Sequence, residues 1–158
     1  MSALRRMMMG GKNNILYQAS NIVFDGTNYI DIGLQLMNGG DFSITMNFTI
    51  TKVNATTSVF LSCRDTSILK GFDIRFNNTN YVRPVLNNTG YNLGNPRALN
   101  DIIELYITKI GNTMTITDGV STVSGTVTTT DKPLTIGANA VGTAKATFKL
   151  NSIIVLKL

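Results

Sequence analysis

The clearest pattern in the chain is a strict alternation of apolar and polar residues in DFSITMNFTIT, residues 41–51. The apolar positions of this segment are Phe42, Ile44, Met46, Phe48 and Ile50. Side chains of a β-strand point alternately to its two faces, so this pattern predicts a half-buried strand in an antiparallel sheet. The Asn-Gly-Gly cluster at 38–40 predicts a turn immediately before it.

Residues 102–127 predict three consecutive strands joined by two tight turns. Gly111-Asn112 separates IIELYITKI from TMTIT, and Asp118-Gly119 separates TMTIT from VSTVSGTV. Such pairs favour positive-φ turns whose twist matches that of the flanking strands. We therefore expect an antiparallel meander in this region.

Shorter apolar runs bounded by Gly, Asn and Asp predict the remaining strands. These runs cover residues 22–24, 28–32, 57–63, 68–76, 80–86, 134–136 and 147–157. Pro84 lacks a backbone N–H, so we expect the strand around it to be edge-like or bulged. No segment sustains the 3.6-residue period of a helix, and the pattern predicts an all-β, antiparallel, two-sheet sandwich.

The order of these elements resembles the laminin-G-like, concanavalin-type jelly roll. The resemblance rests on NIVFDGTNYIDIG, DFSITMNFTI, DIIELYITKIGNTMTITDG, PLTIGAN and ATFKLNSIIVLKL, and it covers about residues 21–158. It implies two curved sheets packed face to face, with the closing strand paired to an early one. Loose patterns of apolar residues and turns of this kind support a fold more strongly than a function.

The first 14 residues follow a different pattern, with three basic side chains, no acidic one, and three consecutive methionines. We expect residues 1–14 to form an extended N-terminal arm, and residues 15–158 to form a single β-sandwich domain. The apolar run Met7–Met9 is too short for the core of a signal peptide.

The arm resembles the N-terminal segments of small virion proteins of tailed phages. We expect it to dock the sandwich onto an assembly. Arg5 and Arg6 could form charge-assisted hydrogen bonds with carboxylates, and Met7, Met8 and Met9 could fill irregular apolar grooves. The alternative is a leader that has no partner.

The amino-acid composition favours some classes of function over others. Charged residues make up 15% of the chain, against about 25% in typical soluble proteins, and 18 Asn and 21 Thr replace them. A neutral surface of hydroxyl and amide groups suits a particle coat or a protein that contacts sugars. No basic stripe interleaved with aromatic residues is present, so we expect no nucleic-acid partner. No apolar run reaches 18 residues, so we expect no membrane partner.

The residues for common catalytic chemistry are missing from the sequence. The chain contains no histidine and a single glutamate, Glu104, whereas retaining glycosidases need two neighbouring carboxyl groups. We therefore predict a protein that is not an enzyme, with no catalytic residues. Cys63 lies in an apolar run, which predicts a buried and unreactive thiol.

Calcium is the one cofactor that the sequence leaves open, since laminin-G-like domains often bind it at the sandwich rim. Asp25, Asp31 and Asp65 could contribute oxygen ligands, although isolated aspartates in turns more commonly form the turn itself. We otherwise expect neither a metal nor another cofactor.

A candidate glycan-binding site lies in residues 64–92, where arginine, acid, amide and tyrosine side chains gather. Its candidates are Arg64, Asp65, Asp73, Arg75, Asn77, Asn78, Tyr81, Arg83, Asn88 and Tyr91. In the run FDIRF, alternation places Asp73 and Arg75 together on the face opposite the core. The simpler alternative is a surface ion pair of little energetic value, at most about 1 kcal/mol.

Two functions follow from these observations. The first is a structural protein of a phage virion, made in the host cytoplasm. It would decorate the capsid or belong to a fibre or tail, in a homo- or hetero-oligomeric assembly with other virion proteins. Its sandwich could also contact cell-surface polysaccharide. The alternative is a stand-alone, lectin-like carbohydrate-binding module.

Overall fold

The computed structural model describes residues 14–38, 40–52, 58–139, 142 and 145–158. The docking residues expected in the arm, Arg5, Arg6 and Met7–Met9, lie outside the described residues, so their role stays a prediction.

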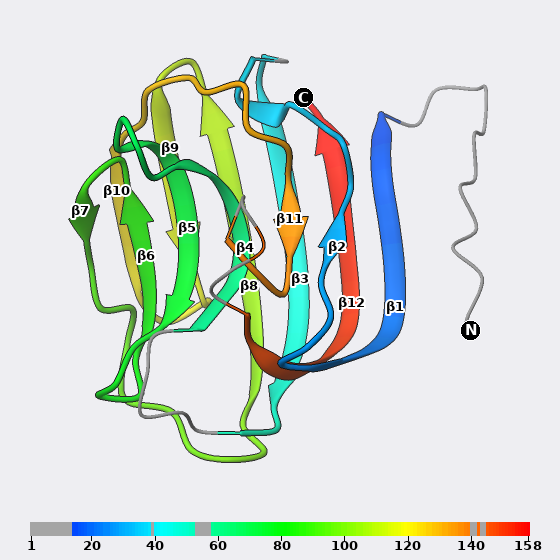
Figure 1. Ribbon diagram of the computed structural model, residues 1–158. Helices are drawn as coiled ribbons and strands as arrows, with labels where there is room; N and C mark the ends of the chain where they lie inside the picture. The colour runs from blue at the N-terminus through cyan, green and yellow to red at the C-terminus, as the bar shows by residue number, and fades with distance from the viewer. Residues whose placement is uncertain (1–13, 39, 53–57, 140–141, 143–144) are drawn as a thin grey trace.

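The described chain is built almost entirely of β-strands (Figure 1). One short 3-10 helix, η1 (Leu36–Asn38), is the exception among the described residues, and none of them forms a helix long and apolar enough to span a bilayer. The strands are β1 (Ile15–Asp25), β2 (Ile30–Asp31), β3 (Phe42–Ile50), β4 (Ser58–Asp65), β5 (Lys70–Phe76), β6 (Val82–Leu86), β7 (Thr89–Gly90), β8 (Ile102–Ile110), β9 (Thr113–Thr117), β10 (Thr122–Thr126), β11 (Thr135–Ile136) and β12 (Thr147–Lys157).

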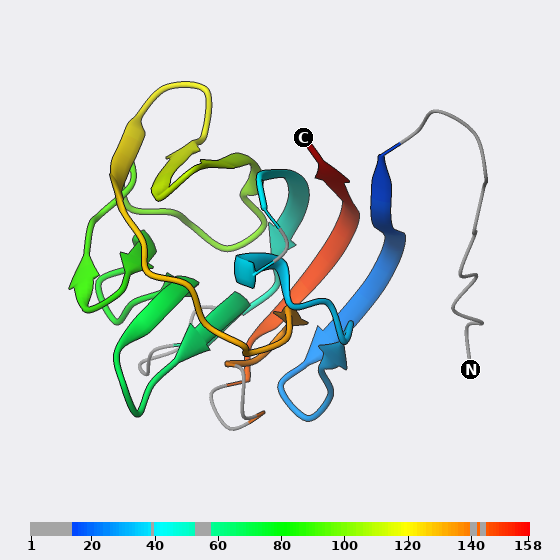
Figure 2. The ribbon, with the colours of Figure 1, turned by 90° about the horizontal axis from the view of Figure 1, so that it is seen from above.

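The strands form two antiparallel sheets packed face to face, which confirms the predicted sandwich. Sheet A has the order β1-β12-β3-β8-β9-β10, and sheet B has the order β2-β11-β4-β5-β6-β7. Sheet B lies in front of sheet A in Figure 1, and the view from above in Figure 2 shows the two layers edge-on. This arrangement is consistent with the jelly-roll class that the element order implies.

The strongest sequence patterns give the strands that they predict. Along β3, every second side chain from Phe42 to Ile50 is buried, as the alternation requires. The meander β8-β9-β10 also forms as predicted, with antiparallel pairing at both of its turns. Gly111 and Gly119 adopt positive φ angles of 57° and 85°, the backbone geometry that favours glycine in such turns.

The first strand is much longer than its sequence predicts. Apolar residues predict a strand over 22–24, whereas β1 spans 11 residues and pairs with β12 along most of its length. Pairing of the closing strand with an early one is as the resemblance implies. The sequence signal is weak because β1 is an edge strand, and because Asn21, with φ of 56°, interrupts the alternation between Ala19 and Ile22.

Pro84 occupies a position that tolerates its missing donor. Its carbonyl accepts a hydrogen bond from the Tyr91 N–H at 2.9 Å, so its ring nitrogen faces the same side, away from β5. On that side β6 meets the two-residue strand β7 and, through an isolated bridge between Val82 and Leu93, the segment that follows it. The sequence predicts an edge-like or bulged strand around Pro84; β6 is instead the last strand but one of sheet B, and Pro84 is tolerated because its ring nitrogen faces the sparsely paired side.

Phenylalanine rings join the two sheets across the core. Phe148 of β12 stacks on Phe24 of β1, with ring centroids 4.5 Å apart. It also meets Phe60 of β4 edge-on at 5.0 Å, and Phe60 contacts Phe48 of β3 at 4.7 Å. Phe60 therefore inserts a ring from sheet B between aromatic side chains of sheet A.

Cys63 points into the same core and is fully buried. Burial, followed by the negative charge of Asp73, raises the pKa of the Cys63 thiol far above its ordinary value. The predicted burial of Cys63 is confirmed, and its raised pKa disfavours the reactive thiolate near neutral pH.

We predict that Phe148→Ala lowers the free energy of unfolding by about 3–5 kcal/mol, because it removes a ring that contacts both sheets and leaves a cavity. Urea denaturation monitored by circular dichroism measures the change. Val120→Ala is the control, because Val120 is 94% exposed and its replacement should change stability by less than about 0.5 kcal/mol. A loss below about 1 kcal/mol in Phe148→Ala would contradict the role given to the aromatic cluster.

Candidate functional site

The candidate site is a group of charged side chains on the outer face of sheet B. In β5, the side chains of Phe72, Ile74 and Phe76 enter the core. Asp73 and Arg75 therefore lie on the opposite face, as the alternation predicts. The structure corrects one expectation, because Asp73 is completely buried and does not form a simple surface pair.

The Asp73 carboxylate organises this group, because both of its oxygens accept hydrogen bonds. Oδ1 accepts one from the Ser62 hydroxyl at 2.5 Å. Oδ2 accepts two from Arg75, from Nη2 at 2.6 Å and from Nε at 3.1 Å, and one from Arg64 Nη1 at 3.4 Å. A buried carboxylate thus holds two guanidinium groups in place.

Arg64 has a structural role within this arrangement. Its side chain is 6% exposed, and its Nε donates to the Asn87 carbonyl at 2.6 Å while Nη2 reaches Asn88 Oδ1 at 3.5 Å. These bonds attach β4 to the turn that follows β6. All three guanidinium nitrogens of Arg64 therefore have protein partners, and little of the group is left for a ligand.

Arg75 and Arg83 are the residues that this face presents to solvent. The register of β5 and β6 places them directly opposite each other, although like charges in that position destabilise a sheet. Arg83 donates only weakly, to Asn92 Oδ1 and to the Gly90 carbonyl, both at 3.4 Å. Among the described residues, no carboxylate forms a salt bridge with it.

The charges of this group do not balance. The guanidinium groups of Arg64, Arg75 and Arg83 supply three positive charges, and Asp73 supplies one negative charge, which leaves two in excess. An anion between Arg75 and Arg83 would relieve their repulsion and could accept bidentate hydrogen bonds from a guanidinium. The arrangement is suited to binding a carboxylate, sulfate or phosphate group.

Asn92 connects the predicted residue Asn77 to this face. Asn92 Oδ1 accepts hydrogen bonds from Arg83 and from the Asn77 side-chain amide, the latter at 3.3 Å. Asn77 Oδ1 in turn accepts from the backbone N–H groups of Thr79 and Tyr81. Asn77 therefore shapes the turn between β5 and β6, and Tyr81, which is half-buried, lies at its end.

The other three predicted glycan residues take different positions, and the first of them, Asn78, is exposed in the turn between β5 and β6. Asp65 accepts hydrogen bonds from the hydroxyl and N–H of Ser67, and these bonds, with the charge of Lys132, lower the Asp65 pKa despite an opposing effect of desolvation. The Tyr91 ring packs against the hydrophobic core between the sheets. The structure therefore brings together Arg64, Asp73, Arg75 and Arg83, and links Asn77 to them.

Ser62 and Asn92 are partners that sequence reasoning missed. Ser62 lies in an apolar run of β4, and Asn92 lies in a loop rich in asparagine, so neither carries a local signal. Only the strand register, which pairs Ser62 with Asp73, reveals the first of them.

The three calcium candidates each form their own turn. In each case the aspartate carboxylate accepts a hydrogen bond from the backbone N–H two residues further along the chain. The pairs are Asp25 with Thr27, Asp31 with Gly33, and Asp65 with Ser67. No cluster of three acidic, cysteine or histidine side chains occurs within the described ranges. Calcium binding stays a prediction without a site assembled from these residues.

Glu104, the single glutamate, lies on β8 in sheet A, next to Tyr106, whose pKa it raises by accepting a hydrogen bond. Asp73 lies on β5 in sheet B. The described residues therefore do not bring Glu104 and Asp73 together in one sheet as a catalytic carboxylate pair.

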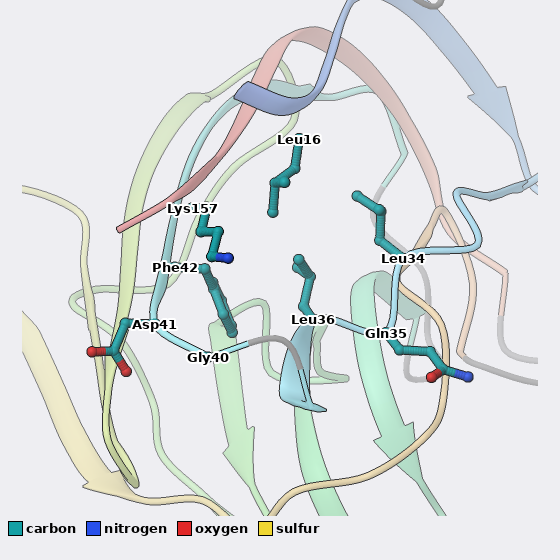
Figure 3. A pocket seen from close by; sticks show the side chains of 8 residues that line it. All are labelled: Leu16, Leu34, Gln35, Leu36, Gly40, Asp41, Phe42 and Lys157. Carbon is teal, nitrogen blue, oxygen red and sulfur yellow. The ribbon is translucent and has the colours of Figure 1, made fainter. Parts of the chain in front are cut away.

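A second feature is an apolar groove of about 210 Å³ at one end of the sandwich (Figure 3). It lies between the start of β1, the end of β12 and the segment that leads into β3. The side chains of Leu16, Leu34, Leu36 and Phe42 converge on it, while Asp41 and Gln35 point away from its centre. Lys157 and Gly40 complete its lining.

Comparison with known proteins gives a likeness of fold. No protein-family model and no curated protein matches the chain. Among solved structures, it resembles the CBM40 of the Ruminococcus gnavus IT-sialidase bound to alpha2,6 sialyllactose, with a TM-score of 0.64 and 15% identity. The match covers 90% of this chain and 92% of that one. The likeness shows that the chain shares its β-sandwich fold with this module.

Whole sialidases also contain this fold. A Trypanosoma rangeli sialidase in complex with 2,3-difluorosialic acid matches 90% of this chain, with a TM-score of 0.70 and 13% identity. A leech intramolecular trans-sialidase matches 91%, with a TM-score of 0.64 and 16% identity. This chain spans about a quarter (26%) of each of those enzymes. The resemblance to laminin-G-like and phage proteins stays a prediction.

We predict that Asp73→Ala lowers the free energy of unfolding by about 3–5 kcal/mol, because it leaves Arg64 and Arg75 without their buried counter-ion. Urea denaturation provides the measurement, with Asp131→Ala as a control that removes an exposed carboxylate. Similar losses in the two variants would show that the Asp73 carboxylate does not organise this face.

Proposed function

We propose that this protein is a non-catalytic carbohydrate-binding module that binds acidic sugars on the outer face of sheet B. The observation that carries the proposal is the facing pair Arg75 and Arg83, which has a local excess of positive charge and, within the described part of the chain, a guanidinium without a carboxylate partner. An acidic sugar would supply the missing negative charge.

The shape of the site supports recognition on an exposed surface. Asp73 is buried beneath Arg75 and holds its Nε and Nη2, so the orientation of this guanidinium is fixed before a ligand arrives. A prearranged group loses less conformational entropy on binding. Neighbouring asparagine amides and backbone carbonyls can hydrogen-bond sugar hydroxyl groups, while the arginine pair selects the acid.

The comparisons support the same class of ligand. The carbohydrate-binding module with this fold was solved with sialyllactose, a sugar that carries a carboxylate, and one of the sialidases was solved with a sialic acid derivative. The match to the module covers nearly all of both chains and favours a role in binding over catalysis.

We predict that the protein binds sialyllactose and that Arg83→Ala weakens this binding at least about tenfold, a loss of about 1.4 kcal/mol. Isothermal titration calorimetry provides the affinities, with lactose as the uncharged ligand control. Arg83 is the residue to change because none of the described carboxylates pairs with it, so its removal leaves no described carboxylate buried without its partner.

Lys149→Ala removes a positive charge from an exposed position in sheet A and is the matched control variant. It should bind sialyllactose as the unchanged protein does. Equal affinity for lactose and sialyllactose, or equal losses in the two variants, would contradict the proposal. Tighter binding to a sulfated glycan than to sialyllactose would show that the site prefers sulfate groups to the carboxylate of a sialic acid.

A second proposal is that the protein is displayed on a phage virion through its N-terminal arm. It is supported by the concentration of basic residues and methionines in residues 1–14 and by the neutral composition of the rest. This role is compatible with glycan binding, since a particle can present a sugar-binding sandwich to a host surface. Other virion proteins would be the partners of the arm.

We predict for this second proposal that deletion of residues 2–14 abolishes incorporation of the protein into phage particles, because the docking side chains are removed. Immunoblotting of purified particles measures incorporation, and Lys149→Ala provides a full-length control. Undiminished incorporation of the shortened protein would rule out anchoring by the arm.

A further inference from the structure

The groove at the end of the sandwich is an apolar space with one cation in its lining (Figure 3). Its apolar walls are formed by Leu16, Leu34, Leu36 and Phe42. Phe42 and Leu36 are 1% and 4% exposed, whereas Leu16 at the edge is 40% exposed. The ammonium of Lys157 points into the space that these side chains surround. The groove therefore offers a ligand both an apolar surface and a positive charge.

The strand register explains why a lysine points into this space. Buried residues alternate near the end of β12, at Ile153 and Val155, and Lys157 takes the next position on the same face. Lys157 pairs with Phe42 of β3, which pairs on its other side with Lys109 of β8. Two lysines thus occupy inward positions beside one phenylalanine, where the alternation would place apolar side chains.

The charges at this end of the sandwich do not balance. Neither lysine forms a salt bridge with a carboxylate of the described residues. Lys109 is 4% exposed, and its Nζ donates to the Gly40 carbonyl at 3.1 Å. Asp41, the acid of the groove lining, points away from the groove, and its Oδ1 accepts the Gly111 N–H at 2.8 Å. The groove is therefore suited to an anion.

The rest of the lining offers few polar groups to a ligand. Backbone carbonyls of the lining accept hydrogen bonds from within the protein at 2.8 to 3.1 Å, namely those of Leu34, Gln35, Gly40 and Asp41. A peptide would bring backbone N–H and C=O groups that need partners here, and burying such groups unpaired is costly. A hydrocarbon chain brings none. The lining therefore favours a ligand that is apolar along its length and anionic at one end.

The size of the groove indicates the length of such a ligand. Its volume of about 210 Å³ holds about seven atoms of a chain, at the roughly 30 Å³ that a water molecule occupies. The alkyl chain of octanoate is of this size. Its carboxylate would then reach the Lys157 ammonium and form a charge-assisted hydrogen bond with it.

We propose that this groove binds a medium-chain fatty acid, with the alkyl chain against the leucines and Phe42 and the carboxylate on Lys157. Filling the groove with an alkyl chain removes apolar surface from water and restores dispersion contacts. The groove is lined from β1, β3, β12 and the segment before β3, whereas the arginine pair lies on β5 and β6. The proposal therefore does not depend on the proposed glycan site.

Amide NMR of the isotope-labelled, full-length chain, titrated with sodium octanoate, tests the proposal. The expected result is saturable shift changes at Leu16, Leu34 and Lys157, with smaller changes at Arg75 and Arg83. Acetate lacks the chain and should bind at least about tenfold more weakly, because each buried methylene contributes to affinity. The absence of saturable changes, or equal affinities for acetate and octanoate, would overturn the proposal. Changes centred on Arg83 would also overturn it and would assign the carboxylate to the arginine pair.

Lys157→Met separates the charge from the apolar contact, because methionine keeps an unbranched chain without the ammonium. This variant should bind octanoate at least about tenfold more weakly and octanol within about twofold of the unchanged protein. Lys149→Met removes a lysine from an exposed position in sheet A and is the matched control, with unchanged octanoate binding expected. Equal affinities for octanoate in the two variants would overturn the proposal.

Leu16→Asp tests the apolar wall. Leu16 is substantially exposed, so this variant is expected to fold, and its amide spectrum verifies that it does. The new carboxylate makes the groove edge polar, so octanoate and octanol should both bind at least about tenfold more weakly. Unchanged binding of octanol would show that the chain does not lie in the groove and would overturn the proposal.

Discussion

The packing of two sheets across one layer of aromatic side chains is the constraint on which the structure depends. Phe60 of sheet B lies among Phe48 and Phe148 of sheet A, so neither sheet can bury its apolar face alone. This packing fixes which residues of every strand point inward. It therefore also decides which residues are left for the outer faces, where the proposed binding site lies.

On the outer face of sheet B, the buried carboxylate of Asp73 positions the neighbouring arginine side chains. Asp73 has no solvent exposure and accepts hydrogen bonds from Ser62, Arg64 and Arg75. The cost of burying one carboxylate is offset by two guanidinium groups. As a result, Arg75 is held firmly while Arg83, its cross-strand neighbour, has only weak partners. This local excess of positive charge is the reason why an acidic ligand is proposed for the outer face of sheet B.

Likeness of fold and choice of ligand rest on different observations. Sandwiches of this kind occur both as a separate binding module and within whole sialidases, at identities of 13–16% to this chain. A fold shared at that level does not transfer a binding site, because side chains diverge while the core pattern persists. The case for acidic sugars therefore depends on the arginine pair of this chain.

The sequence by itself determined the elements whose signals are local. Alternating burial along β3 and the glycine turns of the β8-β9-β10 meander follow directly from residue order, because side-chain direction and turn geometry are set within a few residues. It also placed Asp73 and Arg75 on one face. Only the tertiary structure decided that Asp73 is buried, that Arg83 faces Arg75, and that β1 extends along β12. Those features depend on pairing between distant segments, and no local pattern encodes the register that brings them together.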